Sequence, residues 1–140
     1  MTVESIANVT CGMTAERTVV FTEELVRQFA VFTDDDAPVH VSDDHARNLG
    51  FAGRIAHGLL VGSMYSALLG RSLPGPNSVI LRLSLNMLKP VLIGQTVKFS
   101  VSVTAVSEAA RSVTLDLAGR LPSQERVSSG SAVCVFRGSN

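Results

Sequence analysis

The chain has no tryptophan, one tyrosine and six phenylalanines among its 140 residues. A protein that binds nucleic acid needs a concentrated basic face for phosphates, and base stacking needs exposed aromatic side chains. The 12 lysine and arginine residues are scattered along the sequence and are balanced by 12 acidic ones. We therefore expect no nucleic-acid partner.

Cysteine is also scarce, since Cys11 and Cys134 are the only two and lie near opposite ends of the chain. They form neither a disulfide framework nor a metal-binding spacing, and the composition is not that of a small secreted scaffold. We expect both thiols to be reduced, in a cytoplasmic protein.

The N-terminal segment lacks the basic and apolar parts of a signal peptide. No apolar run reaches the roughly 18 residues of a membrane span, so no membrane partner is expected.

The chain does contain enough apolar sequence for a core, because 46% of its residues are hydrophobic. With no repeat or linker, we expect one domain over residues 1–140. Apolar residues recur at helical spacing in 21–32, with Thr22 as N-cap, and 42–50 has the pattern of a short helix capped by Ser42. Residues 57–70 form a third helical pattern, apolar nearly all round, which is typical of a helix inside a protein.

After the turn-forming segment LPGPN, the hydrophobic period becomes two, as in strands with one buried face. The sequence therefore predicts an α+β fold in which an antiparallel sheet, arranged as a meander, wraps around the central buried helix at about residues 57–70. The predicted strands are 79–88, 97–104, 113–117, 128–136 and a short one near 17–21.

The segment DDDAPVH, residues 34–40, combines acids with a histidine. A carboxylate and an imidazole in one proline-stiffened loop can hold a water between them, because the carboxylate accepts one of its protons and the imidazole accepts or donates the other. Asp35 and His40 are therefore candidates for acid–base chemistry. Pro38 keeps Ala37 extended. Taken alone, the segment is more typical of a solvated acidic turn with a surface histidine.

His57 and Gly58 stand where the third helix is expected to begin. The first amides of a helix have no partner within it and lie at its positive end, so the Gly58 N–H suits a developing oxyanion. Gly58 could instead serve close packing, and His57 could be a structural histidine bonded to the main chain. Ser66 lies two turns further on and either contacts substrate or bonds back to its own helix.

Other catalytic patterns are missing. Neither Ser63 nor Ser66 has an evident base, and there is no nucleophile elbow or phosphate loop. His40, His45 and His57 lack the spacing of a zinc site, so no metal is expected.

The order of these features carries more information than any one of them. The motifs TDDDAPVH and AHGLL, about 17 residues apart, precede a buried helix and the segment LKPVLIGQTV. Over roughly residues 15–137 this order resembles the MaoC-like (R)-specific enoyl-CoA hydratases and dehydratases, which have the hot-dog fold. Their signature is approximately Ser-Gly-Asp-x-Asn-Pro-x-His, followed later by Ala/Val-His-Gly-Met/Leu.

The resemblance implies a function and the residues for it. Asp35 and His40 fall on the catalytic pair, Gly58 on the oxyanion amide and Ser66 on the pocket serine, and we place His57 in the same substrate-binding group as Gly58 and Ser66. The implied reaction is syn addition of water to a trans-2-enoyl thioester of coenzyme A or carrier protein, and its reverse. The implied assembly is a homodimer or higher homo-oligomer with the thioester near the interface, and no cofactor takes part.

The chain departs from the signature at two positions, because Ala37 replaces the asparagine and Asp34 the glycine. The loss of the amide removes hydrogen bonds, and Asp34 and Asp36 place like charges beside Asp35, which makes full ionisation harder. Asp36 is the alternative acid if the loop shifts by one residue. Two other functions stay open: a hot-dog thioesterase, and a non-catalytic hot-dog subunit that binds acyl groups or stabilises an active partner.

Overall fold

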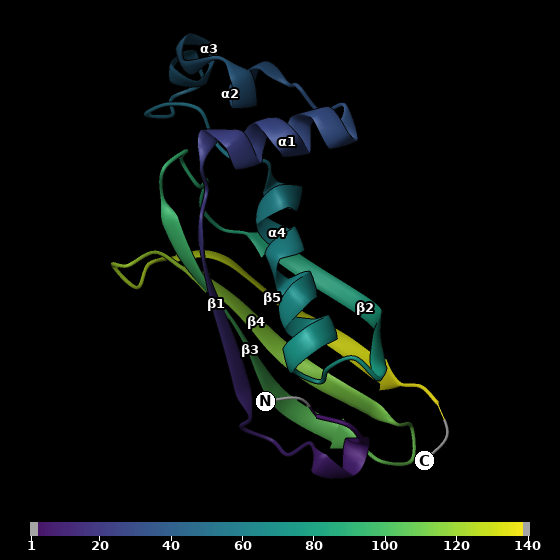
Figure 1. Ribbon diagram of the computed structural model, residues 1–140. Coiled ribbons are helices and arrows are strands. Elements are labelled where there is room, and N and C mark those ends of the chain that lie inside the picture. The colour runs from purple at the N-terminus through teal and green to yellow at the C-terminus, as the bar shows by residue number, and fades with distance from the viewer. Residues whose placement is uncertain (1–2, 139–140) are drawn as a thin grey trace.

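The computed structural model describes residues 3–138, which form one five-stranded antiparallel sheet and a set of helices. One helix, α4, lies along a face of the sheet, and three others gather beyond the N-terminal end of α4 (Figure 1). The elements are η1 (Ile6–Asn8), β1 (Thr14–Val20), α1 (Glu23–Thr33), α2 (Pro38–Val41), α3 (Asp43–Asn48), α4 (Gly58–Ala67), the π-helical turn η2 (Leu68–Ser72), β2 (Ser78–Met87), β3 (Thr96–Ser107), β4 (Ser112–Arg120) and β5 (Arg126–Phe136).

The predicted α+β architecture of a sheet around a central helix is confirmed, but the predicted meander is only partly right. The strand order is β1-β3-β4-β5-β2, so only β3, β4 and β5 follow one another as neighbours. β2 pairs with β5 instead of β3. The reason lies in the connection 88–95, which passes the start of α4 and bonds to the segment 54–56 through Ala56 N–H to Val91 O (2.7 Å) and Ile93 N–H to Arg54 O (3.2 Å). This connection carries the chain to the other side of the sheet.

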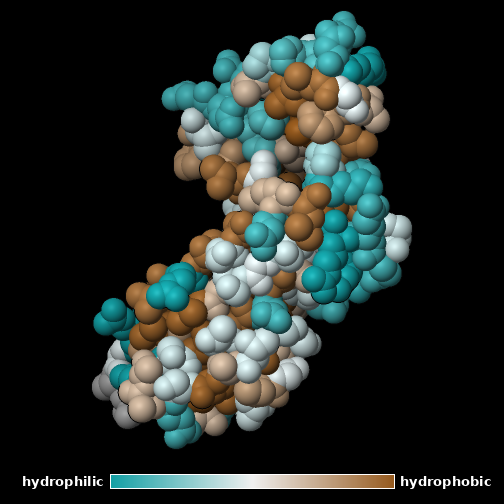
Figure 2. All heavy atoms as spheres, turned by 180° about the vertical axis from the view of Figure 1, so that it is seen from behind, coloured by the Kyte–Doolittle hydropathy of each residue, from teal (hydrophilic) through white to brown (hydrophobic). Residues whose placement is uncertain are grey.

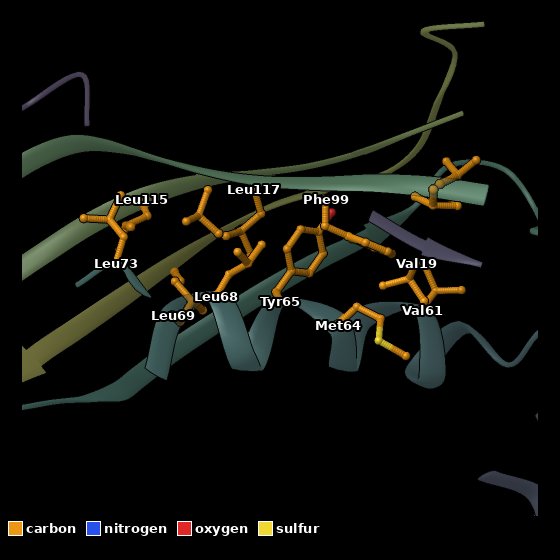
Figure 3. Packing of buried hydrophobic residues seen from close by; sticks show 14 of the residues in the cluster. Val19, Val61, Met64, Tyr65, Leu68, Leu69, Leu73, Phe99, Leu115 and Leu117 are labelled. Carbon is orange, nitrogen blue, oxygen red and sulfur yellow. The ribbon is translucent and has the colours of Figure 1, made fainter. Parts of the chain in front are cut away.

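Apolar packing fixes α4 on the sheet (Figure 3). Tyr65 lies edge-on to Phe99 of β3, with ring centroids 5.1 Å apart, and both rings are fully buried. Burial of each large apolar side chain contributes about 1.5–3 kcal/mol relative to exposure. The position of the first turn of α4 therefore follows from contacts along its whole length. The buried residues in Figure 3 include Val61, Met64, Leu68 and Leu69 from α4 and η2, and Leu115 and Leu117 from β4.

The predicted helix caps are also present. The Thr22 hydroxyl accepts a hydrogen bond from the Leu25 N–H at the start of α1, and Ser42 does the same for the His45 N–H at the start of α3. Gly50, shortly after α3, has φ +92°, a conformation that glycine adopts without strain. Local sequence signals therefore set the start of both helices and the end of α3.

The alternating apolar face of β2, which we expected to be buried, is exposed in the single chain. Leu81 is 67% exposed and Leu83 44% exposed, because β2 is an edge strand that α4 covers only in part, near Leu85. The central helix is likewise open on one side, where Leu59 is 73% exposed and Ser63 and Ser66 are also exposed. Hydrophobic residues gather along this edge of the sheet in Figure 2, at the left of the lower part of the molecule.

Cys11 is exposed and Cys134 is buried, and neither is in a disulfide, as predicted. Burial raises the pKa of the Cys134 thiol to about 11. Within residues 3–138, no helix combines the length and apolar composition that a membrane span needs.

The Tyr65 hydroxyl lies 2.6 Å from the Ser128 hydroxyl, and both residues are fully buried. We predict that Tyr65→Phe lowers the free energy of unfolding by about 1–3 kcal/mol, because it leaves a buried hydroxyl without a partner. Urea denaturation at one fixed protein concentration measures the change. The double variant with Ser128→Ala should cost less than the sum of the two single variants, whereas strict additivity would contradict a stabilising bond.

Candidate active site

The site begins where α4 begins. His57 is the N-cap of α4 and Gly58 is its first residue. The N–H groups of the first turn have no acceptor inside the helix and lie at its positive end, so the Gly58 N–H is available to an oxygen carrying negative charge. Gly58 is exposed and lines a cavity of about 290 Å³ with apolar walls that include Phe51, Met87 and Val91.

The segment before His57 is held on two sides. Ile55 donates its N–H to Val39 O of α2 (3.2 Å), and Ala56 donates to Val91 O (2.7 Å). These bonds fix the direction of the Ile55 carbonyl group. The segment therefore joins the helical part of the molecule to the start of α4.

Arg54 adds an electrostatic anchor to this segment. Its guanidinium lies 2.9 Å from Glu23 of α1 and 3.4 Å from Asp43 of α3, and its main-chain N–H donates to the same Asp43 carboxylate (3.0 Å). The hydrogen bond from this N–H, together with the nearby guanidinium, lowers the pKa of Asp43. Asp43 is therefore ionised at neutral pH and ties α3 to the site.

His40 is oriented by the Ile55 carbonyl. Ala37 is extended, as predicted, and α2 begins directly after it with Pro38 in its first position. The His40 Nδ1 lies 2.8 Å from Ile55 O, and because a carbonyl oxygen only accepts, Nδ1 carries the hydrogen. The other ring nitrogen, Nε2, is then free to accept a proton.

His57 packs against His40 and holds the loop that contains Asp35. The two imidazole rings are stacked, with centroids 3.8 Å apart and an angle of 28° between their planes. The His57 Nε2 lies 2.8 Å from the main-chain oxygen of Asp35, so Nε2 donates the bond. The aromatic ring of Phe29, from α1, lies 4.8 Å from the His57 ring. His57 is only 2% exposed.

The carboxylate of Asp35 completes a cluster with the two rings. One carboxylate oxygen of Asp35 and one ring nitrogen each of His40 and His57 lie within 4.8 Å of one another. One water molecule can bridge such a separation. Asp34 and Asp36 instead line a cavity of about 680 Å³ between α1 and α2, which His40 also borders. The structure therefore brings Asp35 to the histidine pair, in preference to the alternative Asp36.

Comparison with known proteins identifies the family. Residues 7–118 match the family model described as the MaoC like domain. The chain belongs to the MaoC-like family. The resemblance recognised in the sequence is therefore confirmed.

Individual relatives agree with this assignment. An (R)-specific enoyl-CoA hydratase of Rhodospirillum rubrum is 38% identical over 103 residues, which cover 74% of this chain and 72% of that protein. Another from Aeromonas caviae is 40% identical over 83 residues, or 59% of this chain and 62% of that protein. A solved structure described as an (R)-hydratase from A. caviae superposes with a TM-score of 0.88 at 32% identity, covering 93% of this chain and 98% of that one. These neighbours confirm the expected hot-dog fold.

Ser66, expected in the pocket of this MaoC-like chain, lies apart from the cluster. It is eight residues beyond Gly58, which corresponds to about 12 Å along the helix. Its side chain is on the exposed side of α4 together with Leu59 and Ser63. The structure does not bring Ser66 to Asp35 and His40, and its role stays a prediction.

The residue types in the cluster of this MaoC-like chain also bind metals. A metal lies close to the plane of each imidazole that binds it, and stacked rings have nearly parallel planes. The His40 and His57 rings therefore do not converge on one ion in this arrangement. His45, on α3, is exposed and lies outside the cluster.

Two parts of the site gave no signal in the sequence. The His40–His57 stack joins residues 17 positions apart that match no ligand spacing, and the Ile55 carbonyl belongs to the main chain, which every residue has. The contact between His40 of the motif PVH and His57 of the motif AHG could have been suspected only from the order of these motifs in the family.

Proposed function

We propose that this MaoC-like protein catalyses the reversible addition of water to a trans-2-enoyl thioester, with Asp35 and His40 as the catalytic pair. The observation that carries the proposal is the cluster of the Asp35 carboxylate with the His40 ring. His57 belongs to the same cluster and directly precedes Gly58, whose amide begins α4. The names of the relatives bear out the expected reaction class, a hydro-lyase acting on acyl thioesters. The residue roles are our own inference.

The thioester carbonyl oxygen accepts a hydrogen bond from the Gly58 N–H. As water adds to C3, the electrons of the double bond move toward C2 and the carbonyl oxygen, which becomes an enolate. A donor already aimed at this oxygen, at the positive end of a helix, stabilises the charge as it develops. The cavity beside Gly58 gives the thioester an apolar place to bind.

The water lies between Asp35 and His40. The carboxylate accepts a hydrogen bond from one O–H of the water, and this hydrogen stays on the oxygen. The free His40 Nε2 takes the other hydrogen as a proton while the oxygen bonds to C3. His40 then delivers a proton to C2, so that one water molecule has been added in full. Both the hydroxyl group and the proton come from the same side of the double bond, which makes the addition syn.

We also propose that the protein is a homodimer joined along β2. An exposed strand edge with apolar side chains is a template for pairing with another strand, and β2 exposes Leu81, Leu83 and Met87. The exposed side of α4 lies next to this edge: a Cβ atom added to Gly62 of α4 would lie only 3.6 Å from the Met87 side chain. A second copy placed antiparallel on β2 would cover both surfaces.

Such a dimer would place the substrate cavity at the interface. Met87 is the last residue of β2 and also lines the cavity beside Gly58. A partner strand on β2 would therefore lie beside the bound thioester, as the family resemblance implies.

We further propose that residues 1–140 form one domain, since one hydrophobic cluster extends from Val3 to Phe136. The cytoplasmic location and the choice between coenzyme A and carrier protein stay predictions.

We predict that Asp35→Asn and His40→Ala each lower the hydration of a crotonyl thioester by about 10²–10⁴-fold, the usual contribution of a general acid or base. Loss of the enoyl absorbance measures the rate. Asp36→Asn and His45→Ala are matched controls, because they change the same residue types outside the cluster, and both should stay near the wild-type rate.

The same assay separates the competing functions. Normal turnover by both Asp35→Asn and His40→Ala would contradict the proposed mechanism. Release of free thiol from the enoyl thioester would identify a thioesterase. A wild-type protein without activity on any acyl thioester that copurifies with a second hot-dog chain would instead be a non-catalytic subunit.

For the assembly, we predict that Leu83→Arg converts the dimer to a monomer, because it places a charge on the apolar edge of β2. Sedimentation velocity measures the mass. Val20→Arg is the matched control, since Val20 is a similarly exposed apolar residue on β1, the opposite edge strand. A dimer in the Leu83→Arg protein, or a monomer only in the Val20→Arg protein, would contradict pairing through β2.

A further inference from the structure

Within residues 3–138, His57 is the one buried polar side chain that contacts both members of the proposed catalytic pair. Its Nε2–H bonds to the Asp35 carbonyl at 2.8 Å, and its ring lies on the His40 ring with centroids 3.8 Å apart. It also directly precedes Gly58 in the chain. We propose that His57 is a positioning residue: it holds Asp35, His40 and the Gly58 amide in one arrangement and does not touch the substrate. This inference rests on the proposed function and differs from the substrate-binding role that we expected for His57.

The loop that carries Asp35 needs such a support. Asp34, just before it, has φ +59° and ends α1, so the chain turns sharply at this point. The remaining hydrogen bonds of Asp35 are local, from its N–H to Thr33 Oγ1 (3.3 Å) and from the Ala37 N–H to its carboxylate (3.2 Å). Among the described residues, the bond from His57 is the hydrogen bond that ties residues 34–37 to the start of α4.

The ring of His57 contributes through its shape as well as its hydrogen bond. His40 is held at one edge by the Ile55 carbonyl, and the stacked His57 ring packs against its face, so the ring is restrained in two directions. Phe29 of α1 packs against His57 in turn. The free Nε2 of His40 is therefore directed by its neighbours before any substrate is bound.

The hydrogen on His57 is assigned by its contacts. The Asp35 carbonyl oxygen can only accept, so Nε2 carries the hydrogen. Nδ1 is fully buried and has no partner among the described residues, so a hydrogen there would have no acceptor. Because Nε2 is bonded to the Asp35 carbonyl and Nδ1 is buried, neither ring nitrogen of His57 is open to a substrate in this arrangement.

Two substitutions separate the hydrogen bond of His57 from its ring. Glutamine places its amide nitrogen the same number of bonds from Cβ as His57 Nε2, so His57→Gln keeps the donor. His57→Phe keeps a flat ring but has no donor, and the Asp35 carbonyl loses its partner. His45→Gln is the matched control, because His45 is an exposed histidine outside the cluster.

The measurement is the hydration of a crotonyl thioester, with kcat and KM determined separately. We expect His57→Phe to lower kcat by about 10²-fold with KM little changed, as small misplacements of a catalytic group do. We expect His57→Gln to recover at least part of this loss and His45→Gln to behave as wild type. Equal kcat losses in the Gln and Phe variants, or a rise in KM with kcat unchanged, would overturn the proposal.

A second measurement does not depend on activity or on the variants folding. In the ¹⁵N-labelled wild-type protein, histidine NMR should show the His57 hydrogen on Nε2 and the His40 hydrogen on Nδ1. A His57 hydrogen on Nδ1 would overturn the positioning role. If the wild-type protein shows the expected tautomers but hydrates no enoyl thioester, the proposed function fails while the arrangement of the two rings stands.

Discussion

Two hydrogen bonds from histidine rings to main-chain carbonyl groups determine the geometry of the site. The bond from His40 to Ile55 leaves Nε2 of His40 as the free nitrogen, and the bond from His57 to Asp35 holds the acidic loop against the start of α4. The stacking of the two rings joins these bonds into one unit. The proposed catalytic pair, Asp35 on an exposed loop and His40 on α2, thereby takes its position from the buried part of the protein.

That position depends on how α4 sits on the sheet. Tyr65 packs on Phe99 and bonds to Ser128 deep in the core. These contacts fix the position of α4 on the sheet, and with it the position of its first turn. The same arrangement leaves one side of α4 and the strand β2 uncovered in the single chain. The chemistry proposed for Asp35 and His40 and the dimer proposed along β2 therefore meet at the cavity beside Gly58, which Met87 also lines.

Much of this could be predicted from the sequence, for identifiable reasons. The period of two gave the strands, side-chain caps such as Thr22 and Ser42 gave the helix starts, and the order of the Asp–Pro–His and His–Gly motifs gave the candidate residues. The place of β2 could not be predicted, because an alternating pattern does not say which strand lies beside it or what covers its apolar face. The ring stack and the role of the Ile55 carbonyl could not be predicted either, since they depend on tertiary contacts without a local signal.

The stereochemistry of hydration in D₂O is the most direct test of a water held by Asp35 and His40 on one side of the double bond. The wild-type protein should convert a trans-2-enoyl thioester into a 3-hydroxyacyl thioester with a single deuterium at C2, syn to the new hydroxyl group, which proton NMR of the product can establish. A product with the deuterium anti to the hydroxyl group, or an equal mixture of the two arrangements, would contradict delivery of both groups from this pair.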